Sequence, residues 1–438
     1  MPTTVTLIPT KGFEYVNTPV PLSLTSVPLS LSYFFRKLIY MSQAKKAFAN
    51  QLLLFAASIF MMGLYSGLYD PSFNNYLSQV HQLGEVARGG LEFPRELPGF
   101  LVVFVFTALA FFADSRIAML AALIVGISLW GQGFLAPNMR MVVLWMLLWS
   151  TGAHLFMVLK SSISLRLTVQ GQEGRLLGRL GALEAAGALC GMLAVYLGVS
   201  HFHFSFGVIF GVAGTFALLA ALCLYLLDPK PIKRPPHYLL FKKKYCLYYL
   251  LSILFGARKQ VFLTFAPWVL IKVFNTQVQT FALLGLIGTV VSLGFRPLLG
   301  KAIDTWGERM VIFLESTILV VICILYGFSL YWFSAQIALV IIMICYIIDQ
   351  LLFAVTMART TYLNRIADSR DDVAPTLSMG TTLDHGVSMT IPFAGGIIWA
   401  LFGFHWVFIA AAVIALLNMV ASLFIPGIEE ERLSNRGV

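Results

Sequence analysis

Apolar segments long enough to cross a lipid bilayer recur along almost the whole chain. A helix of roughly 20 apolar residues spans the hydrocarbon core, and a backbone in lipid must satisfy its own hydrogen bonds, as a helix does. The alternating pattern of a β-barrel is absent. The sequence therefore predicts an all-α integral membrane protein with 12 transmembrane helices, at 48–72, 95–113, 116–136, 140–163, 175–199, 203–227, 246–272, 278–300, 309–331, 334–358, 376–402 and 404–426.

The composition excludes most other classes. Of the 438 residues, 59% are hydrophobic and only 11% are charged, whereas a soluble chain carries roughly a quarter charged residues. No phosphate-binding loop and no nucleophile with a base is found, so neither an enzyme nor an ATP-driven pump is expected. Five cysteines lie in or beside apolar blocks without metal-ligand spacing, so no disulfide framework, metal or cofactor is expected: Cys190, Cys223, Cys246, Cys323 and Cys345.

The net charge of +10 is a topology signal rather than a nucleic-acid signal. Alternate loops are poor in basic residues, and the remaining loops are rich in them. By the positive-inside rule both termini are cytoplasmic, in a plasma membrane that we expect to be a bacterial inner membrane. Residues 1–46 lack the pattern of a signal peptide. The basic loops contain Arg36, Lys37, Lys45, Lys46, Lys160, Arg166, Arg175, Arg179, Lys230, Lys233, Arg234, Lys242, Lys243, Lys244, Lys301, Arg309, Arg365 and Arg370.

The chain has the organisation of a duplicated six-helix unit. Its longest polar interruption, "DPKPIKRPPHYLLFKKKY", follows the sixth block, and internal repeats are common in transporters. "LFMVLKSSISLR" (155–166) also resembles "LFAVTMARTTYLNR" (352–365). The predicted parts are a lead-in (1–46), a first bundle (47–227), a linker (228–245), a second bundle (246–426) and a tail (427–438).

Two short loops resemble the signature loop of the major facilitator superfamily, roughly Gly-x-x-x-Asp-x-x-Gly-x-Arg/Lys. "GKAIDTWGER" supplies Gly300, Asp304, Gly307 and Arg309, while "FFADSRIAM" keeps only Asp114 and Arg116. The resemblance implies two six-helix bundles around a central cavity, with alternating access. It also implies that Asp114, Asp304 and Arg309 act in gating. The Gly-Pro-x-x-Gly-Gly run of drug/proton antiporters is incomplete in "LGALEAAGALCGML", which has no proline.

Adjacent cations lie deep in the seventh block, at Arg258 and Lys259. Ionisable residues at membrane depth usually face a cavity or a partner. One interpretation is that they bind an anionic group of the substrate; the other is a buried structural ion pair. Asp349, beside Gln350 in the tenth block, is either a proton-coupling carboxylate or the counter-ion of these cations.

Glu184 and Asp384 occupy related positions in blocks five and eleven. Their register relative to Lys160 and Arg359 predicts one charge pair in each half. These pairs form either an inner gate or a permanent link between helices. His385 titrates nearest physiological pH, so a proton relay is a further possibility there.

Polar residues toward the predicted extracellular side complete the candidate set. Tyr65 and Tyr69 are four residues apart and so share one face of a helix. These two residues and Asp70 either line the cavity or belong to an interfacial aromatic belt. Arg95 and Glu96, in the cluster "RGGLEFPRELPGF", form either an extracellular gate or a solvated helix start. Two further residues are more often satisfied bundle residues than ligands: Gln132 and His154.

Together these features predict a secondary active transporter of a small organic solute, coupled to protons and monomeric in the bilayer. The paired cations favour an anionic or zwitterionic substrate. The alternative is an efflux pump for amphipathic or multidrug substrates, suggested by the aromatic and Met richness. A membrane enzyme or receptor is the third class considered.

Overall fold

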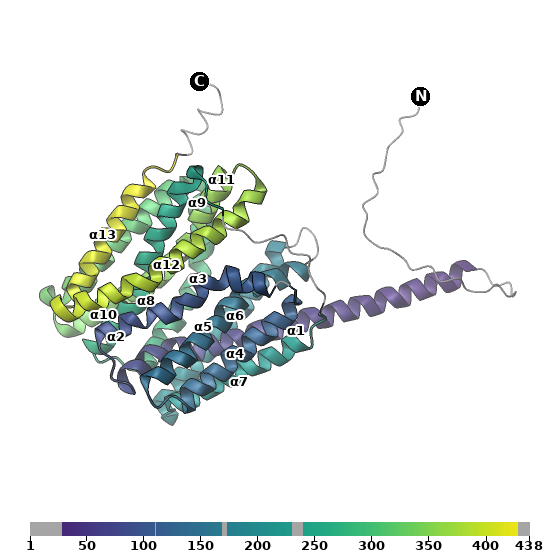
Figure 1. Cartoon of the computed structure of the whole chain (residues 1–438), viewed down its shortest axis with the longest axis horizontal. Coiled ribbons are helices and arrows are strands. Elements are labelled where there is room, and N and C mark those ends of the chain that lie inside the picture. Colours follow the sequence, from purple (N-terminus) through teal and green to yellow (C-terminus); the bar gives the residue numbers. More distant parts are fainter. Residues whose placement is uncertain (1–28, 110, 169–172, 230–239, 428–438) are drawn as a thin grey trace, which may run out of the picture. The chain divides into compact units, whose positions relative to one another are not determined.

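The computed structural model describes residues 29–109, 111–168, 173–229 and 240–427 (Figure 1). The chain divides into two units, residues 1–49 and residues 50–438. The described residues are helical and contain no strand. The elements are α1 (Leu29–Gln79), α2 (Glu85–Gly90), α3 (Glu92–Ala108), α4 (Asp114–Phe134), α5 (Met139–Arg166), α6 (Glu173–Phe202), α7 (Phe206–Tyr225), η1 (Lys243–Tyr245), α8 (Cys246–Lys272), α9 (Val278–Trp332), α10 (Ala335–Leu352), η2 (Phe353–Val355), α11 (Thr356–Ile366), α12 (Arg370–Phe402) and α13 (Phe404–Ser422).

Ten helices in the described part of the chain are long and apolar enough to cross a membrane. One of them, α9, has 55 residues and a non-helical Gly307 (φ 79°, ψ 165°), so it contains two predicted spans joined at a break. Only glycine adopts such a φ without strain. The helix α3 is not among the ten; it is the second predicted span, and its first two turns carry Glu92, Arg95 and Glu96. The prediction of an all-helical membrane fold is confirmed.

Two predicted helix boundaries were wrong because prolines lie inside helices. The first span was predicted to end at residue 72, yet α1 runs through Pro71 to Gln79. The second span was predicted to begin at residue 95, yet α3 begins at Glu92 and runs through Pro94 and Pro98. Pro94 lies in the first turn, where its N–H would lack a helical partner. Membrane helices also tolerate interior prolines, because their neighbours satisfy the freed carbonyl groups.

The helices pack in a related way in the two predicted halves. In the first half α4 packs on α5 and α7, and in the second α9 packs on α10 and α13. The halves meet where α12 contacts α2 and α3, and where α6 contacts α9. Small residues bring α1 and α6 together: a Cβ atom on Gly63 or Gly67 would meet the carbonyl oxygen of Glu184 or Ala188. Close backbone contact of this kind is typical of membrane helices.

The two copies of the signature-like loop differ in burial. Asp114, from the incomplete copy, is fully buried at the start of α4 and accepts a hydrogen bond from Ser162 of α5. Nearby, Arg116 donates to the carbonyl of Tyr225 in α7, over 2.5 Å. Asp304, from the complete copy, is exposed in a groove beside α11. In this complete copy of the loop, Glu308 forms an ion pair with Arg365, at 3.1 Å.

Candidate functional site

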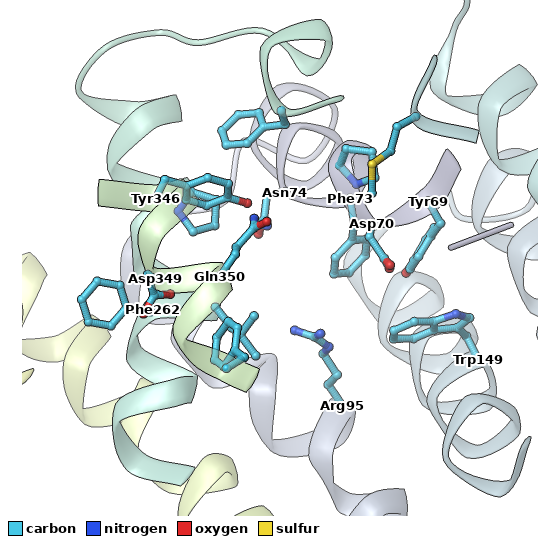
Figure 2. Close-up of a pocket in the computed structure, with 16 residues that line it drawn as sticks. Tyr69, Asp70, Phe73, Asn74, Arg95, Trp149, Phe262, Tyr346, Asp349 and Gln350 are labelled. Atoms are coloured by element: carbon cyan, nitrogen blue, oxygen red, sulfur yellow. The ribbon is translucent and has the colours of Figure 1, made fainter. Parts of the chain in front are cut away.

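A cavity of about 280 Å³ lies between helices of the two predicted halves (Figure 2). Its walls come from α1, α3, α5 and α6 on one side, and from α8, α9, α10 and η2 on the other. Many of the lining side chains are aromatic, and the charged ones are Asp70, Arg95 and Asp349. The lining residues are Tyr69, Asp70, Pro71, Phe73, Asn74, Arg95, Trp149, Met192, Phe262, Leu263, Pro267, Phe281, Tyr346, Asp349, Gln350 and Phe353.

One carboxylate and one guanidinium point into this cavity from the first half. Figure 2 shows Asp70 and Arg95 directed toward the same open space. Asp70 accepts a hydrogen bond from Ser66 and has no ion-pair partner among the described residues. Arg95 Nη1 donates hydrogen bonds to both carboxylate oxygens of Glu92, over 3.1 Å each. Its Nη2 makes no hydrogen bond within the described chain, so both a cation and an anion of a solute would find a partner here.

Aromatic packing fixes the wall around Asp70. Tyr69 packs against Trp149 with the rings tilted and their centroids 4.8 Å apart, and its hydroxyl donates to Gln132 over 3.0 Å. Gln132 is therefore a supporting residue and is not among the cavity-lining residues. Tyr65 is buried one turn below Tyr69 and likewise does not line the cavity. Trp149, which the sequence did not single out, forms the floor beside Arg95, 5.9 Å from the guanidinium.

Arg258 belongs to a buried four-residue network in the second half. It donates to Asp349 over 3.0 Å and to Glu315 over 2.8 Å, and Arg359 donates to the other oxygen of Glu315 over 2.9 Å. All four side chains are at most 5% exposed. The network holds two cations and two anions, so it is neutral as a whole. Asp349 alone of the four lines the cavity.

Lys259 also has its own counter-ion. Its ammonium contacts both oxygens of Asp384 in α12, at 2.7 and 2.9 Å. In the first half, Lys160 pairs with Glu184 at 2.7 Å as predicted. The corresponding prediction for Arg359 and Asp384 was wrong, because Arg359 pairs with Glu315 and Asp384 with Lys259. Register along the sequence fixes which residues are equivalent, but not which neighbouring helix comes nearest.

The charge cluster at the start of the second span forms part of the contact between the halves. Glu92 is fully buried and forms ion pairs with Arg88 at 2.5 Å and with Arg95 at 3.1 Å. It also accepts a hydrogen bond from Gln260 of α8 over 2.5 Å. Arg88 also donates to Asn74 of α1 over 2.9 Å. The cluster is therefore a packed junction of α1, α2, α3 and α8 rather than a solvated helix start.

Glu96 and two histidines form a second junction. Glu96 of α3 lies 2.8 Å from His385 Nδ1 in α12. The ring of His154, from α5, lies edge-on to that of His385, with centroids 5.0 Å apart. His154 Nδ1 lies 2.9 Å from the carbonyl oxygen of Ser150. The structure thus brings together three predicted residues that are far apart in the sequence.

A second cavity, of about 590 Å³, lies between α6 and α9 and is also bordered by Gln350 and Leu351. Gln350 therefore borders both cavities. Arg296 lines this second cavity, is exposed, and has no ion-pair partner among the described residues. Sequence reasoning missed Arg296 and Glu315, although each stands as an isolated ionisable residue in an apolar block, which is the signal that identified Asp349.

Comparison with solved structures relates this helical arrangement to transporters. The nucleoside transporter NupG aligns with a TM-score of 0.69 and 13% identity, over 86% of this chain and 99% of that chain. The POT family transporter PepTSo aligns with a TM-score of 0.67 and 12% identity, over 86% and 96% of the two chains. A D-xylose–proton symporter aligns with a TM-score of 0.63 and 16% identity, over 86% of this chain and 96% of that chain. At these identities the likeness shows the fold.

Sequence comparison identifies the family. No curated protein matches the chain. A family model described as Major Facilitator Superfamily matches residues 97–382, well over half of the 438 residues. The matched region includes both signature-like loops and most of the charged residues described above. The chain therefore belongs to the major facilitator superfamily and is an integral membrane transporter.

Proposed function

We propose that this chain carries a small zwitterionic solute across the membrane by alternating access, coupled to protons. The two moving parts would be the halves 47–227 and 246–426, with the central cavity as the binding site. The observation that carries the proposal is the presence of Asp70 and Arg95 in one aromatic cavity, each with unused binding capacity.

The cavity suits a zwitterion better than a simple anion. Arg258 and Lys259, which first favoured an anionic substrate, are already neutralised by Asp349, Glu315 and Asp384. A solute ammonium would pair with Asp70 and a solute carboxylate with Arg95 Nη2. Charge-assisted hydrogen bonds of this kind are the strong ones. The rings of Phe73 and Trp149 would contact the apolar part of the solute.

The cavity volume also favours a small solute over a large amphipathic drug. Ligand pockets commonly measure roughly 300–1,000 Å³, and this cavity, at about 280 Å³, is near the lower limit. The structural relatives carry names of nucleoside, xylose and peptide transporters, which are also small polar solutes. These observations favour the small-solute proposal over the multidrug alternative.

Contacts between the halves support an inward-open arrangement. Within the described residues, four side-chain hydrogen bonds join the first half to the second, all involving the end of α1 or the start of α3, which the predicted topology places toward the extracellular side. Gly178 and Gly181, at the predicted cytoplasmic end of α6, line the second cavity described above, between α6 and α9. The four bonds are Asn75–Thr276 (2.9 Å), Gln79–Gln277 (3.4 Å), Glu92–Gln260 (2.5 Å) and Glu96–His385 (2.8 Å).

Asp70 is our candidate for the proton-binding group. A carboxylate at membrane depth without a fixed cation is a natural proton carrier, and Asp70 would exchange its proton for the solute ammonium. Asp349 is the second candidate, because it lines the same cavity while contacting Arg258. In that role its ion pair would have to open during the cycle.

The test begins with thermal-shift screening of purified protein against amino acids, dipeptides, nucleosides, sugars, carboxylates and hydrophobic cations. We expect zwitterions to stabilise the protein, and Asp70→Asn and Arg95→Gln each to remove that stabilisation. Because proton and solute would exchange at one carboxylate, an outwardly directed proton gradient in proteoliposomes should drive accumulation of the stabilising solute by the unmodified protein but not by Asp70→Asn. Stabilisation only by hydrophobic cations, undiminished in Arg95→Gln, would instead support the efflux alternative.

A further inference from the structure

The cluster of Glu96, His154 and His385 has the composition of a transition-metal site. Each residue offers one ligand atom, and these atoms all lie within 4.8 Å of one another. Glu96 and His385 are 6% and 7% exposed, and His154 is part-buried. Two imidazoles and one carboxylate are a common ligand set for Zn²⁺, with a fourth position left for water. We infer that the protein binds a divalent transition-metal ion such as Zn²⁺ at this cluster.

The orientation of His154 supports this inference. Its Nδ1 lies 2.9 Å from the carbonyl oxygen of Ser150 and 3.1 Å from the Ser150 hydroxyl. A hydrogen bond from Nδ1–H to the carbonyl leaves Nε2 with a lone pair. Metal-binding histidines are usually held in this way, with the second ring nitrogen bonded to a carbonyl or carboxylate.

The backbone leaves room for the two rings to meet. A Cβ atom built on Gly99 would lie 2.6 Å from His154 Nε2 and 2.7 Å from His385 Cε1. Glycine at this position of α3 therefore lets both imidazoles occupy the space one turn from Glu96. Zinc bonds of about 2.0–2.1 Å place two tetrahedral ligands roughly 3.3 Å apart, so the three ligand atoms, which now lie within 4.8 Å of one another, would move closer together on binding.

The neighbouring charges permit a cation at this position. The cations that act on Glu96 are Lys259, paired with Asp384 at 2.7 Å, and Arg95, which contacts Glu92 at 3.1 Å and shares that carboxylate with Arg88. Glu96 is left as the one carboxylate of the cluster, facing His385 at 2.8 Å. A divalent cation would therefore bind one carboxylate and two imidazoles, each of which must be in its neutral form to bind a metal.

The site would join the two halves of the transporter. Glu96 and His154 come from α3 and α5, whereas His385 comes from α12. A bound metal ion would bond both halves at once and hold them in the conformation described here. Metal binding should therefore inhibit transport. This expected inhibition rests on the proposed alternating access, whereas the metal binding itself does not.

Metal binding is tested on the purified full chain after treatment with a chelator. We expect Zn²⁺ alone, at micromolar concentrations, to raise the Tm, and His154→Ala and His385→Ala each to weaken Zn²⁺ binding at least tenfold. His201→Ala, which removes an exposed histidine at the end of α6, is the matched control and should bind as tightly as the unmodified protein. Equal binding by all four proteins, or no binding, would overturn the inference.

A spectroscopic measurement covers the case in which a histidine variant does not fold. One equivalent of Cu²⁺ on the unmodified protein should give an electron paramagnetic resonance spectrum with hyperfine splitting from two imidazole nitrogens. A spectrum with one nitrogen, or with oxygen ligands only, would overturn the site. Transport assays then separate the two claims: Zn²⁺ that binds in this way without slowing transport leaves the site intact and removes the conformational lock.

Discussion

The two halves of the protein use their intramembrane charges differently. In the first half, the Lys160–Glu184 pair is 28% and 36% exposed, while Asp70 and Arg95 face the cavity with capacity to spare. In the second half, Arg258, Arg359, Glu315 and Asp349 are buried and bonded to one another. Under the proposed function, the first half would supply the groups that bind the solute, beside its own buried Arg88–Glu92 pair, whereas the buried network of the second half would act as support.

The largest effect should follow removal of the central carboxylate of the second half. Glu315→Gln leaves Arg258 and Arg359 without their shared anion, and removing one partner of a buried pair costs about 3–5 kcal/mol. We expect a large fall in the Tm of the purified protein. Glu184→Gln is the matched control; its half-exposed pair should contribute less than about 1 kcal/mol. Equal losses in the two variants would erase the contrast between the halves.

Asp70→Asn should change binding without changing stability. The variant keeps the shape of the cavity but loses a charge-assisted bond to the solute, which corresponds to roughly a 10- to 100-fold loss of affinity. Isothermal titration with the screened ligand measures it, and the Tm without ligand should stay the same. Asp304→Asn, at an exposed carboxylate outside the cavity, should bind normally. A fall in the Tm of Asp70→Asn would place Asp70 in the scaffold instead.

The Lys259–Asp384 pair lies between these extremes, because both side chains are 16% exposed. We expect Lys259→Met and Asp384→Leu each to lower the Tm, and the double variant to lower it by less than the sum. A coupling energy of about 1–2 kcal/mol is typical for residues in direct contact. Strict additivity would mean that the two residues do not stabilise each other.

The smallest effect is expected where the linker meets α12. Hydrogen bonds from Lys244 and Lys242 lower the pKa of the Asp368 carboxyl below its usual value. A lowered pKa in the folded state gives stabilisation that is present above the ordinary Asp pKa and lost as the pH falls through the folded value. The Tm of the unmodified protein should fall as the pH is lowered through this range, and the Tm of Asp368→Asn should fall less. High salt should reduce this pH-dependent fall in the unmodified protein. Asp371→Asn, at an adjacent exposed carboxylate, should behave like the unmodified protein.

The sequence predicted the fold better than the partners of its charges. Block length and charge placement were enough for the helical membrane fold, and register was enough for Lys160 and Glu184. The partner of Asp384 could not be predicted, because it depends on the close approach of α8 and α12 at Gly256. Glu315 was missed because a single acid between apolar residues was not weighed against the cations of another helix. The cavity roles of Asp70, Arg95 and Asp349 remain predictions.

The glycine contact between α1 and α6 has a mechanical consequence. Gly63 and Gly67 lie directly on the backbone of Glu184 and Ala188, so any larger residue at either position would push α1 and α6 apart. Asp70 of α1 and Met192 of α6 line the same cavity, so such a substitution would also widen the distance between these two parts of its wall.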